Sequence, residues 1–179
     1  SSDLKKNITG TNTMHIIKEA RVPVITLRKN PTEPGCSHIL LPLDLTKQSI
    51  VQASNAIAAA KMMNAKITVV SLLTDGRKSI EIKFIQRLDE IRKVFEELDV
   101  SCDVKLVPPD KKGPVQSLNE LAGKLRADLL MIMTQQELNI TEYFVGSLAQ
   151  QIINGSDIPV MSINPLAGER SGIPDPLSE

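Results

Sequence analysis

Aromatic residues are scarce in this sequence, and neither sign of charge is in excess. Phe, Tyr and Trp together make up 2% of the 179 residues, and there is no Trp. Lys plus Arg and Asp plus Glu both number 21, so the formal net charge is zero. Proteins that bind single-stranded nucleic acid generally stack the bases on aromatic side chains, and sequence-independent phosphate binding needs a positive field. Because neither feature is present, we expect no nucleic-acid partner.

The sequence also lacks the patterns of metal sites, disulfide frameworks and membrane spans. Its two cysteines, Cys36 and Cys102, are far apart, and its two histidines, His15 and His38, have no cluster of ligands nearby. Zinc sites and disulfide frameworks need more ligands at closer spacing. No apolar run approaches the roughly 20 residues of a transmembrane helix, and we recognise no signal peptide. We therefore expect a soluble, cytoplasmic protein without metal or membrane contact.

The sequence does contain an internal repeat. Residues 10–27 align without a gap on residues 146–163, a shift of 136 positions (146 minus 10). Val22-Pro23-Val24 then matches Ile158-Pro159-Val160, and Thr26 matches Ser162. A repeat of this kind indicates a duplicated structural unit. We therefore interpret 1–30 as the last helix and strand of a preceding module, 31–37 as a linker, 38–166 as a complete module and 167–179 as a loose tail.

Within the complete module, short apolar runs alternate with helical patterns. Strands are predicted where Ile, Leu, Val and Met run together, at 38–44, 66–73, 101–107, 128–133 and 158–163. Helices are predicted at 49–64, 79–98 and 115–125, and from near Gly146 onward. Apolar strands separated by helices favour parallel pairing with right-handed crossovers. The pattern predicts a doubly wound open α/β fold, a five-stranded parallel sheet with helices on both faces.

Three segments of the sequence resemble the universal stress protein family. These are HILLPLD at 38–44, ADLLMIM at 127–133 and GSLAQQIINGSDIPVMSI at 146–163. The resemblance covers about residues 38–165 and implies an adenine nucleotide alpha hydrolase-like fold. Because the closing Gly…Pro-Val pattern occurs twice, the chain resembles tandem-type family members whose N-terminal module is represented here only by its last helix and strand.

The two closing strands are predicted to pair with each other. A closing strand leaves an open sheet edge, and proteins seldom leave such an edge unpaired. The resemblance implies that these edges dock two modules or two subunits. We predict antiparallel pairing of residues 22–27 with 158–163, within the chain or across a homodimer, with the helix around 11–20 covering the joint. The predicted interface residues are Val22, Val24, Ile25, Leu27, Ile158, Val160, Met161 and Ile163.

A nucleotide site is only partly matched. The resemblance implies an acid after the first strand that holds a ribose, and a glycine-rich loop after the fourth strand that wraps phosphates. Asp44, Thr46, Gly146 and Ser147 are the candidate residues for this crevice, although Ser147 fits a helix N-cap equally well. Met133 and Gln136 stand where the motif has glycines, and no Lys or Arg occurs from 127 to 169. We therefore interpret the loop as degraded and expect no cofactor, with ATP disfavoured.

The functional prediction follows from this combination. No nucleophile elbow, phosphate-binding loop or dinucleotide fingerprint occurs, and the charges of 79–98 alternate in sign as on a solvated, salt-bridged helix face. We predict a non-catalytic module that acts in stress response through dimerisation and an unknown protein partner. The alternative is an adenine-nucleotide-binding sensor or slow ATPase that uses Asp44 and Gly146-Ser147. A third arrangement puts the nucleotide site in the missing part of the first module.

Overall fold

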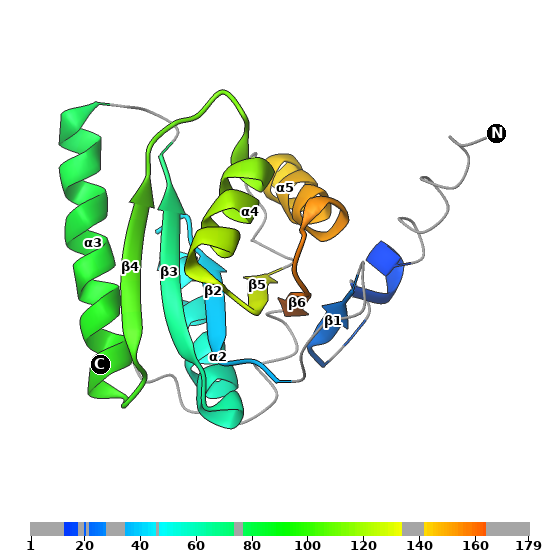
Figure 1. Cartoon of the computed structure of the whole chain (residues 1–179). Coiled ribbons are helices and arrows are strands. Elements are labelled where there is room, and N and C mark those ends of the chain that lie inside the picture. The colour runs from blue at the N-terminus through cyan, green and yellow to red at the C-terminus, as the bar shows by residue number, and fades with distance from the viewer. Residues whose placement is uncertain are drawn as a thin grey trace.

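The computed structural model describes residues 13–17, 20, 22–27, 35–45, 47–73, 77–133 and 142–163, with the backbone alone at 47–52 and 142–147. A single six-stranded sheet runs through the described part of the chain, in the order β1-β6-β5-β2-β3-β4 (Figure 1). The strands are β1 (Val24–Thr26), β2 (His38–Pro42), β3 (Lys66–Leu72), β4 (Cys102–Val107), β5 (Leu129–Met133) and β6 (Val160–Ile163). The helices are α2 (Lys47–Met63), α3 (Lys78–Glu97), α4 (Pro114–Leu125) and α5 (Glu142–Gly155).

Five of the strands are parallel, as the alternating sequence pattern predicts. β2 pairs with β3 on one side and with β5 on the other, β3 continues to β4, and β5 continues to β6. The chain therefore builds the sheet outward in one direction and then, after β4, in the other. The direction changes between β2 and β5, and ligands of open α/β sheets bind beyond the carboxyl ends of the strands at such a point.

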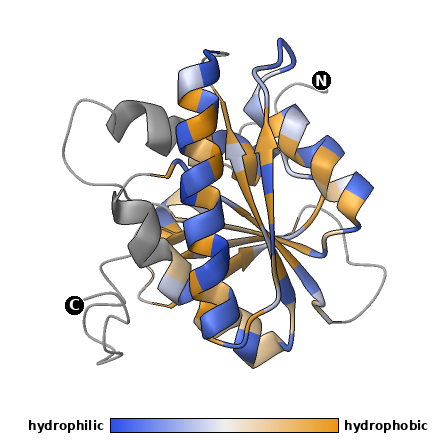
Figure 2. Cartoon of the chain, turned by 90° about the vertical axis from the view of Figure 1, so that its left-hand side faces the viewer, coloured by the Kyte–Doolittle hydropathy of each residue, from blue (hydrophilic) through white to orange (hydrophobic). Residues whose placement is uncertain are grey.

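The sheet is buried on both faces. All five residues of β5 are buried, as are five of the seven in β3, which is typical of a central parallel strand. One core cluster joins alternate strand residues to α2 and α3, and Phe95 is its largest fully buried side chain. The other joins the remaining strand residues to α4 and α5, including Leu118 and Ile152. Figure 2 shows hydrophobic residues concentrated on the strands and on the inner sides of the helices.

Helix α4 illustrates how the local sequence sets an element's bounds. Gly113 has φ 84°, a left-handed conformation that glycine adopts without strain, and Pro114 follows at the first helical position. The helix then runs to Leu125, after which Arg126 takes the left-handed conformation at φ 52°. The predicted helix at 115–125 is thus confirmed to within one residue.

One predicted helix start is wrong. We expected the last helix to begin near Gly146, but α5 begins at Glu142, so Gly146 and Ser147 lie within the helix. The residues from 142 to 145 include no proline or glycine, and nothing in them stops a helix from continuing upstream. Ser147 is therefore not the N-cap of this helix.

The antiparallel joint forms within this chain. Strand β1 pairs with β6 through Val24–Ser162, Ile25–Met161 and Thr26–Val160. A short helix at 13–17 precedes β1, and its Ile17 is buried in the same core cluster as Val160. Figure 1 shows β1 beside β6, at the opposite edge of the sheet from β4. The described strand is shorter than the predicted 22–27, and residues 1–12, 28–34 and 164–179 of the predicted segments lie outside the described residues.

Candidate functional site

The turn after β2, at the switch point of the sheet, carries one of the predicted ligand residues. Asp44 is exposed just beyond the carboxyl end of β2. The backbone N–H of Leu43 donates to the carbonyl oxygen of Val70 at 2.9 Å, so the pairing with β3 extends one residue past the strand. Leu45 then takes a left-handed conformation at φ 60° and buries its side chain in the core. This turn directs the chain so that the flanking leucines are buried while Asp44 faces outward.

Sequence reasoning missed a cation at this turn. The guanidinium of Arg87, on α3, donates a hydrogen bond to the backbone carbonyl oxygen of Leu45. Arg87 is 42 positions away from Leu45 in the sequence, and the alternating charges of the helix give no sign of which one turns inward. The turn that carries Asp44 therefore also has a positive charge beside it. The sequence argument against phosphate binding considered only residues 127–169, where no Lys or Arg occurs, and so did not include Arg87.

The other residues of the predicted nucleotide site lie in β5, in α5 or outside the described residues. Met133 is the last residue of β5 and buries its side chain among the core residues next to α2 and α3, so it stands in the strand and not in the loop. Gly146 and Ser147 are inside α5. Thr46 and Gln136 lie outside the described residues.

A buried polar cluster lies at the opposite, amino end of the sheet. Nδ1 of His38 is 3.2 Å from the carbonyl oxygen of Leu125, which can only accept, so Nδ1 carries the proton. In the neutral ring Nε2 then accepts from the hydroxyl of Thr68 at 2.8 Å. Burial, and to a smaller extent the charge of Lys66, lower the pKa of His38. The ring is therefore neutral at pH 7 and ties β2, β3 and the end of α4 together, as expected of a structural histidine.

Asp128 completes this cluster. Its Oδ2 accepts hydrogen bonds from the backbone N–H and the hydroxyl of Ser37, both at 2.8 Å, and from the N–H of His38 at 3.0 Å. Partial burial works to raise the pKa of Asp128, but these hydrogen bonds outweigh it and leave the pKa below its ordinary value. The carboxylate holds the start of β2 against β5, which is a structural role.

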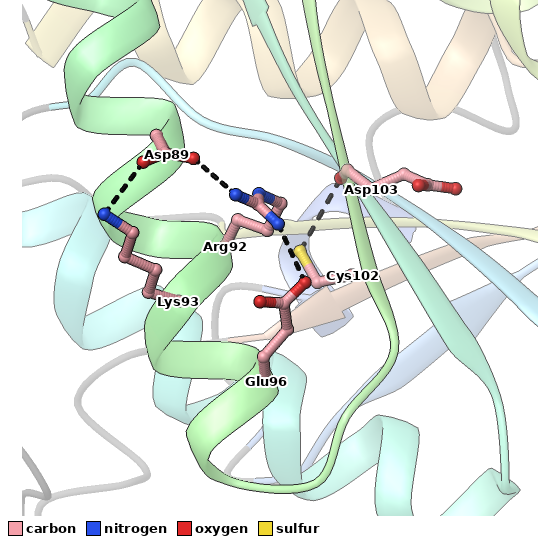
Figure 3. Close-up of polar contacts among 6 residues, drawn as sticks. All are labelled: Asp89, Arg92, Lys93, Glu96, Cys102 and Asp103. Carbon is pink, nitrogen blue, oxygen red and sulfur yellow. Dashed lines mark hydrogen bonds and ion pairs between the residues drawn. The ribbon is translucent and has the colours of Figure 1, made fainter.

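Four charged residues of α3 form ion pairs on the solvent side. Arg92 bonds Asp89 at 2.6 Å and Glu96 at 3.0 Å, and Lys93 bonds the other oxygen of Asp89 at 3.0 Å (Figure 3). The side chains are between 36% and 61% exposed. The hydrogen bond from Arg92 lowers the pKa of Asp89, which is the opposite of the shift that a general acid needs. The predicted salt-bridged face is confirmed.

The thiols are not activated. Burial raises the pKa of Cys102 to about 12, and burial also raises the pKa of Cys36. A reactive cysteine needs a lowered pKa and access to solvent. Among the described residues no group of three or more His, Cys, Asp or Glu side chains is placed to hold a metal ion, and no described helix is long and apolar enough to cross a membrane.

The closing-strand edge is the second candidate site. We call 13–27 the first closing unit and 149–163, its equivalent in the repeat, the second closing unit.

Equivalent apolar residues of the two units differ sharply in burial. The exposed fractions, first unit against second, are 60% against 4% for Ile16 and Ile152, 50% against 3% for Ile25 and Met161, and 53% against 8% for Leu27 and Ile163. Val22 is also exposed, whereas its equivalent Ile158 is half-buried. The edge of the described sheet is therefore apolar and open to solvent.

The sheet order and its helices define this chain as a doubly wound α/β protein. Comparison with known sequences then places it: the pattern of the universal stress protein family matches residues 36–164. The chain belongs to the universal stress protein family. A universal stress protein of Methanocaldococcus jannaschii is 23% identical over 139 residues, which are 70% of this chain and 80% of the relative.

Of two solved structures that resemble this chain, one is shorter than the chain and the other is longer. A universal stress protein in complex with cAMP superposes with a TM-score of 0.58 at 19% identity, covering 74% of this chain and 99% of its own. A universal stress protein from Archaeoglobus fulgidus superposes with a TM-score of 0.66 at 16% identity, covering 92% of this chain but only 57% of its own. At these identities the likeness shows the fold alone.

Proposed function

We propose that this chain is a non-catalytic universal stress protein module that acts in stress response by association through its closing strands. The observation that carries the proposal is the β1–β6 ladder, in which a strand outside the family domain at 36–164 completes the edge of that domain. Association by strand addition needs a free sheet edge with apolar side chains beside it. Strand β1 offers both, since the described sheet ends at β1 and Ile25 and Leu27 are exposed there.

The same observation supports a tandem-type arrangement. The first closing unit has the sequence pattern of the second but has fewer neighbouring strands. The strand of the second unit, β6, lies between β1 and β5, whereas no described strand lies on the outer side of β1. Exposed apolar side chains whose repeat equivalents are buried indicate a missing neighbour of similar shape. The solved structure that matches 92% of this chain has 43% of its own length left over (100% minus 57%), which is room for such a neighbour. We propose that the first closing unit belongs to a preceding module.

Sedimentation velocity tests the association. We expect the chain to self-associate as its concentration rises, because the open apolar edge is the surface available to it. Ile25→Lys combined with Leu27→Lys places two charges on the edge and should abolish the association. Ile85→Lys is the matched control, since Ile85 is exposed to the same degree on α3, away from the edge. A chain that stays monomeric at every concentration, or a control that loses association equally, would refute the proposal.

A second candidate function is adenine-nucleotide binding at the switch point. It is favoured by Asp44 beyond β2, by Arg87 at the same turn, and by the cAMP complex of a protein with the same fold. It is opposed by Met133 and Gln136 in place of glycines. The proposal that Asp44 contacts a ribose and that Gly146-Ser147 contact phosphate rests on the family pattern.

Thermal-shift titrations with cAMP and with ATP plus Mg²⁺, together with mass spectrometry of the denatured protein for carried-over nucleotide, decide between the two. For a non-catalytic association module we expect no dose-dependent shift, no bound nucleotide and no phosphate release. A saturable shift that Asp44→Asn removes and the control Asp157→Asn retains would instead establish the nucleotide site. Release of phosphate from ATP would overturn the non-catalytic assignment.

A further inference from the structure

The described sheet has a second open edge, at β4, on the opposite side from β1. Strand β4 is the last strand in the sheet order and pairs with β3. The carbonyl oxygens of Ser101 and Val107 both accept hydrogen bonds from β3 at 2.9 Å. Successive residues of a strand direct their N–H and C=O groups to opposite sides, so the odd-numbered residues from 101 to 107 bond β3. The backbone groups of Cys102, Val104 and Leu106 therefore point outward, where no described strand receives them.

The side chains of β4 divide between the two faces of the sheet. Val104 and Leu106 pack against the core cluster next to α2 and α3. Asp103 and Lys105 are exposed, and strand alternation places both on the opposite face. Figure 3 shows the side chain of Asp103 directed away from α3. Among the described residues, no ion pair or hydrogen bond involves the side chain of Asp103 or of Lys105. One face of the edge therefore carries an unpaired carboxylate and an unpaired ammonium group two positions apart.

The other face of the edge is bordered by exposed apolar residues of α3. Ile85, Arg92 and Glu96 lie on one side of this helix, because they are separated by about two turns and about one turn. Figure 3 shows Arg92 and Glu96 beside Cys102 at the start of β4, and both charges act on its thiol. A short turn joins the end of α3 to this start, so the two elements run in opposite directions (Figure 1). Ile82 and Ile85, both half exposed, therefore lie beside the far end of β4.

We propose that the outer edge of β4 is a docking site for an extended segment of a partner protein, which adds to the sheet as an antiparallel strand. Charge complementarity defines the segment: the residue opposite Lys105 is acidic, and the residue opposite Asp103 is basic. Opposed residues of an antiparallel ladder point to the same face, and opposite charges there stabilise the pairing. Because the backbone groups of Val104 point outward, Val104 exchanges hydrogen bonds with the residue between these two. The charged pairs then take the positions without hydrogen bonds, where side chains are closest.

A single extended segment fits this edge better than a second copy of the chain does. The sequence of β4 includes Asp103-Val104-Lys105, so a second copy would also supply an acidic, an apolar and a basic residue in the required order. Two copies related by a two-fold axis at Val104 would, however, place both α3 helices on the same face of the joint. Helix α3 already stands on the outer side of β4 (Figure 1, Figure 2). Packed helices need about 8–10 Å between their axes, whereas paired strands are about 4.8 Å apart. An extended segment brings no helix with it.

Fluorescence anisotropy of the full chain with a labelled peptide, Thr-Val-Glu-Val-Lys-Val-Thr, tests the docking site. In the proposed register the Glu of the peptide lies opposite Lys105, its central Val opposite Val104 and its Lys opposite Asp103. We expect saturable binding. The peptide Thr-Val-Lys-Val-Glu-Val-Thr has the same composition and should bind about tenfold more weakly, because both charged pairs become pairs of like charge. Replacing the central Val of the first peptide with Pro should abolish binding, because Pro has no N–H to donate to the edge.

Variants of the chain separate this docking site from the proposed association through closing strands. Asp103→Lys combined with Lys105→Asp should invert the preference between the two peptides. Lys105→Glu alone should remove the preference, and it serves if circular dichroism shows that the double variant does not fold. Ile85→Lys should weaken the binding of both peptides and leave self-association unchanged, whereas Ile25→Lys combined with Leu27→Lys should do the reverse. Absence of saturable binding, equal affinities for the two peptides, or an unchanged preference in the charge variants would overturn the docking site and leave the proposed association intact. Peptide binding that weakens as self-association increases would mean that a second copy occupies the edge, and would overturn the proposal as well.

Discussion

The two closing units show how one sequence pattern acquires two environments. Ile17 in the first unit and its equivalent Ile153 in the second are both buried in the same core cluster. Ile16 and Ile152 are equivalent too, yet Ile16 is exposed and Ile152 is buried. The second unit has β5 beside its strand and α4 beside its helix, whereas the first unit has only β6 as a described neighbour strand. The amphipathic sequence pattern therefore indicates which residues can be buried. The strands and helices that pack beside each unit decide which of these residues are buried.

The largest expected effect contrasts the two helical isoleucines. Ile152→Ala should lower the free energy of unfolding by about 2–5 kcal/mol, because it leaves a cavity in the core. Ile16→Ala should change it by no more than about 0.5 kcal/mol, because the side chain is exposed and Ala favours helix. Urea unfolding followed by circular dichroism measures both. Equal losses would mean that Ile16 is covered in solution and that the contrast between the units is absent.

A smaller effect is expected from pH, which should change stability through His38 at the centre of the sheet and not through the closing strands. The lowered pKa of His38 means that the unfolded chain binds its proton more readily than the folded chain. The contribution of this group to stability is complete above about pH 6.5. It falls as the pH drops from there toward the lowered folded pKa, with a slope of at most about 1.4 kcal/mol per pH unit, and levels off below it. Lys66, Asp128 and Asp103 are the charged groups that act on this ring.

The predicted pH dependence is tested by measuring the free energy of unfolding between about pH 7.5 and about pH 5. These values bracket the ordinary histidine pKa of about 6.5. His38→Gln keeps a hydrogen-bonding side chain without a proton to gain, so its stability should depend less on pH in this window. β1 and β6 contain no titratable side chain, so variants in these two strands should keep the pH profile of the parent. An unchanged pH profile in His38→Gln would exclude His38 as the source.

The two hydroxyls of the joint should respond in opposite ways in the monomer. Thr26→Val removes a half-buried hydrogen bond to Val160 and should cost about 0.5–1.5 kcal/mol. Ser162→Ala removes a buried hydroxyl that has no described partner, so the free energy of unfolding should stay the same or rise. Urea midpoints of the two variants against the parent give the answer, and a clear loss in Ser162→Ala would show that its hydroxyl is paired.

The smallest effect is expected on the outer face of α3. Arg92 bonds Asp89 and Glu96, but all three side chains are open to solvent, and such pairs contribute little because water and salt screen them. Arg92→Ala should leave the urea midpoint unresolved from that of the parent at physiological ionic strength. A marked loss of stability, persisting at high salt, would contradict this assignment.

Much of the fold followed from the sequence because the apolar runs are long and regular. The strands at β3, β4 and β5 and helices α3 and α4 agree with their predicted ranges to within a residue or so at each end. The start of α5 did not agree, because a glycine was taken as a helix boundary where the chain was already helical. Arg87 at the turn after β2 could not be found from the sequence, since nothing local distinguishes it from the other charges of its helix.

By itself the sequence determined the alternation of strands and helices, the repeat at 136 residues and the match of residues 36–164 to the universal stress protein family. These depend on local propensity and periodicity, which neighbouring residues set among themselves. Only the tertiary structure decided that β1 pairs with β6 about the Ile25–Met161 centre, that Ser162 is buried without a partner, and that Asp44 shares its turn with Arg87. Those facts depend on which distant segments meet, because burial and hydrogen bonding are properties of the assembled layers.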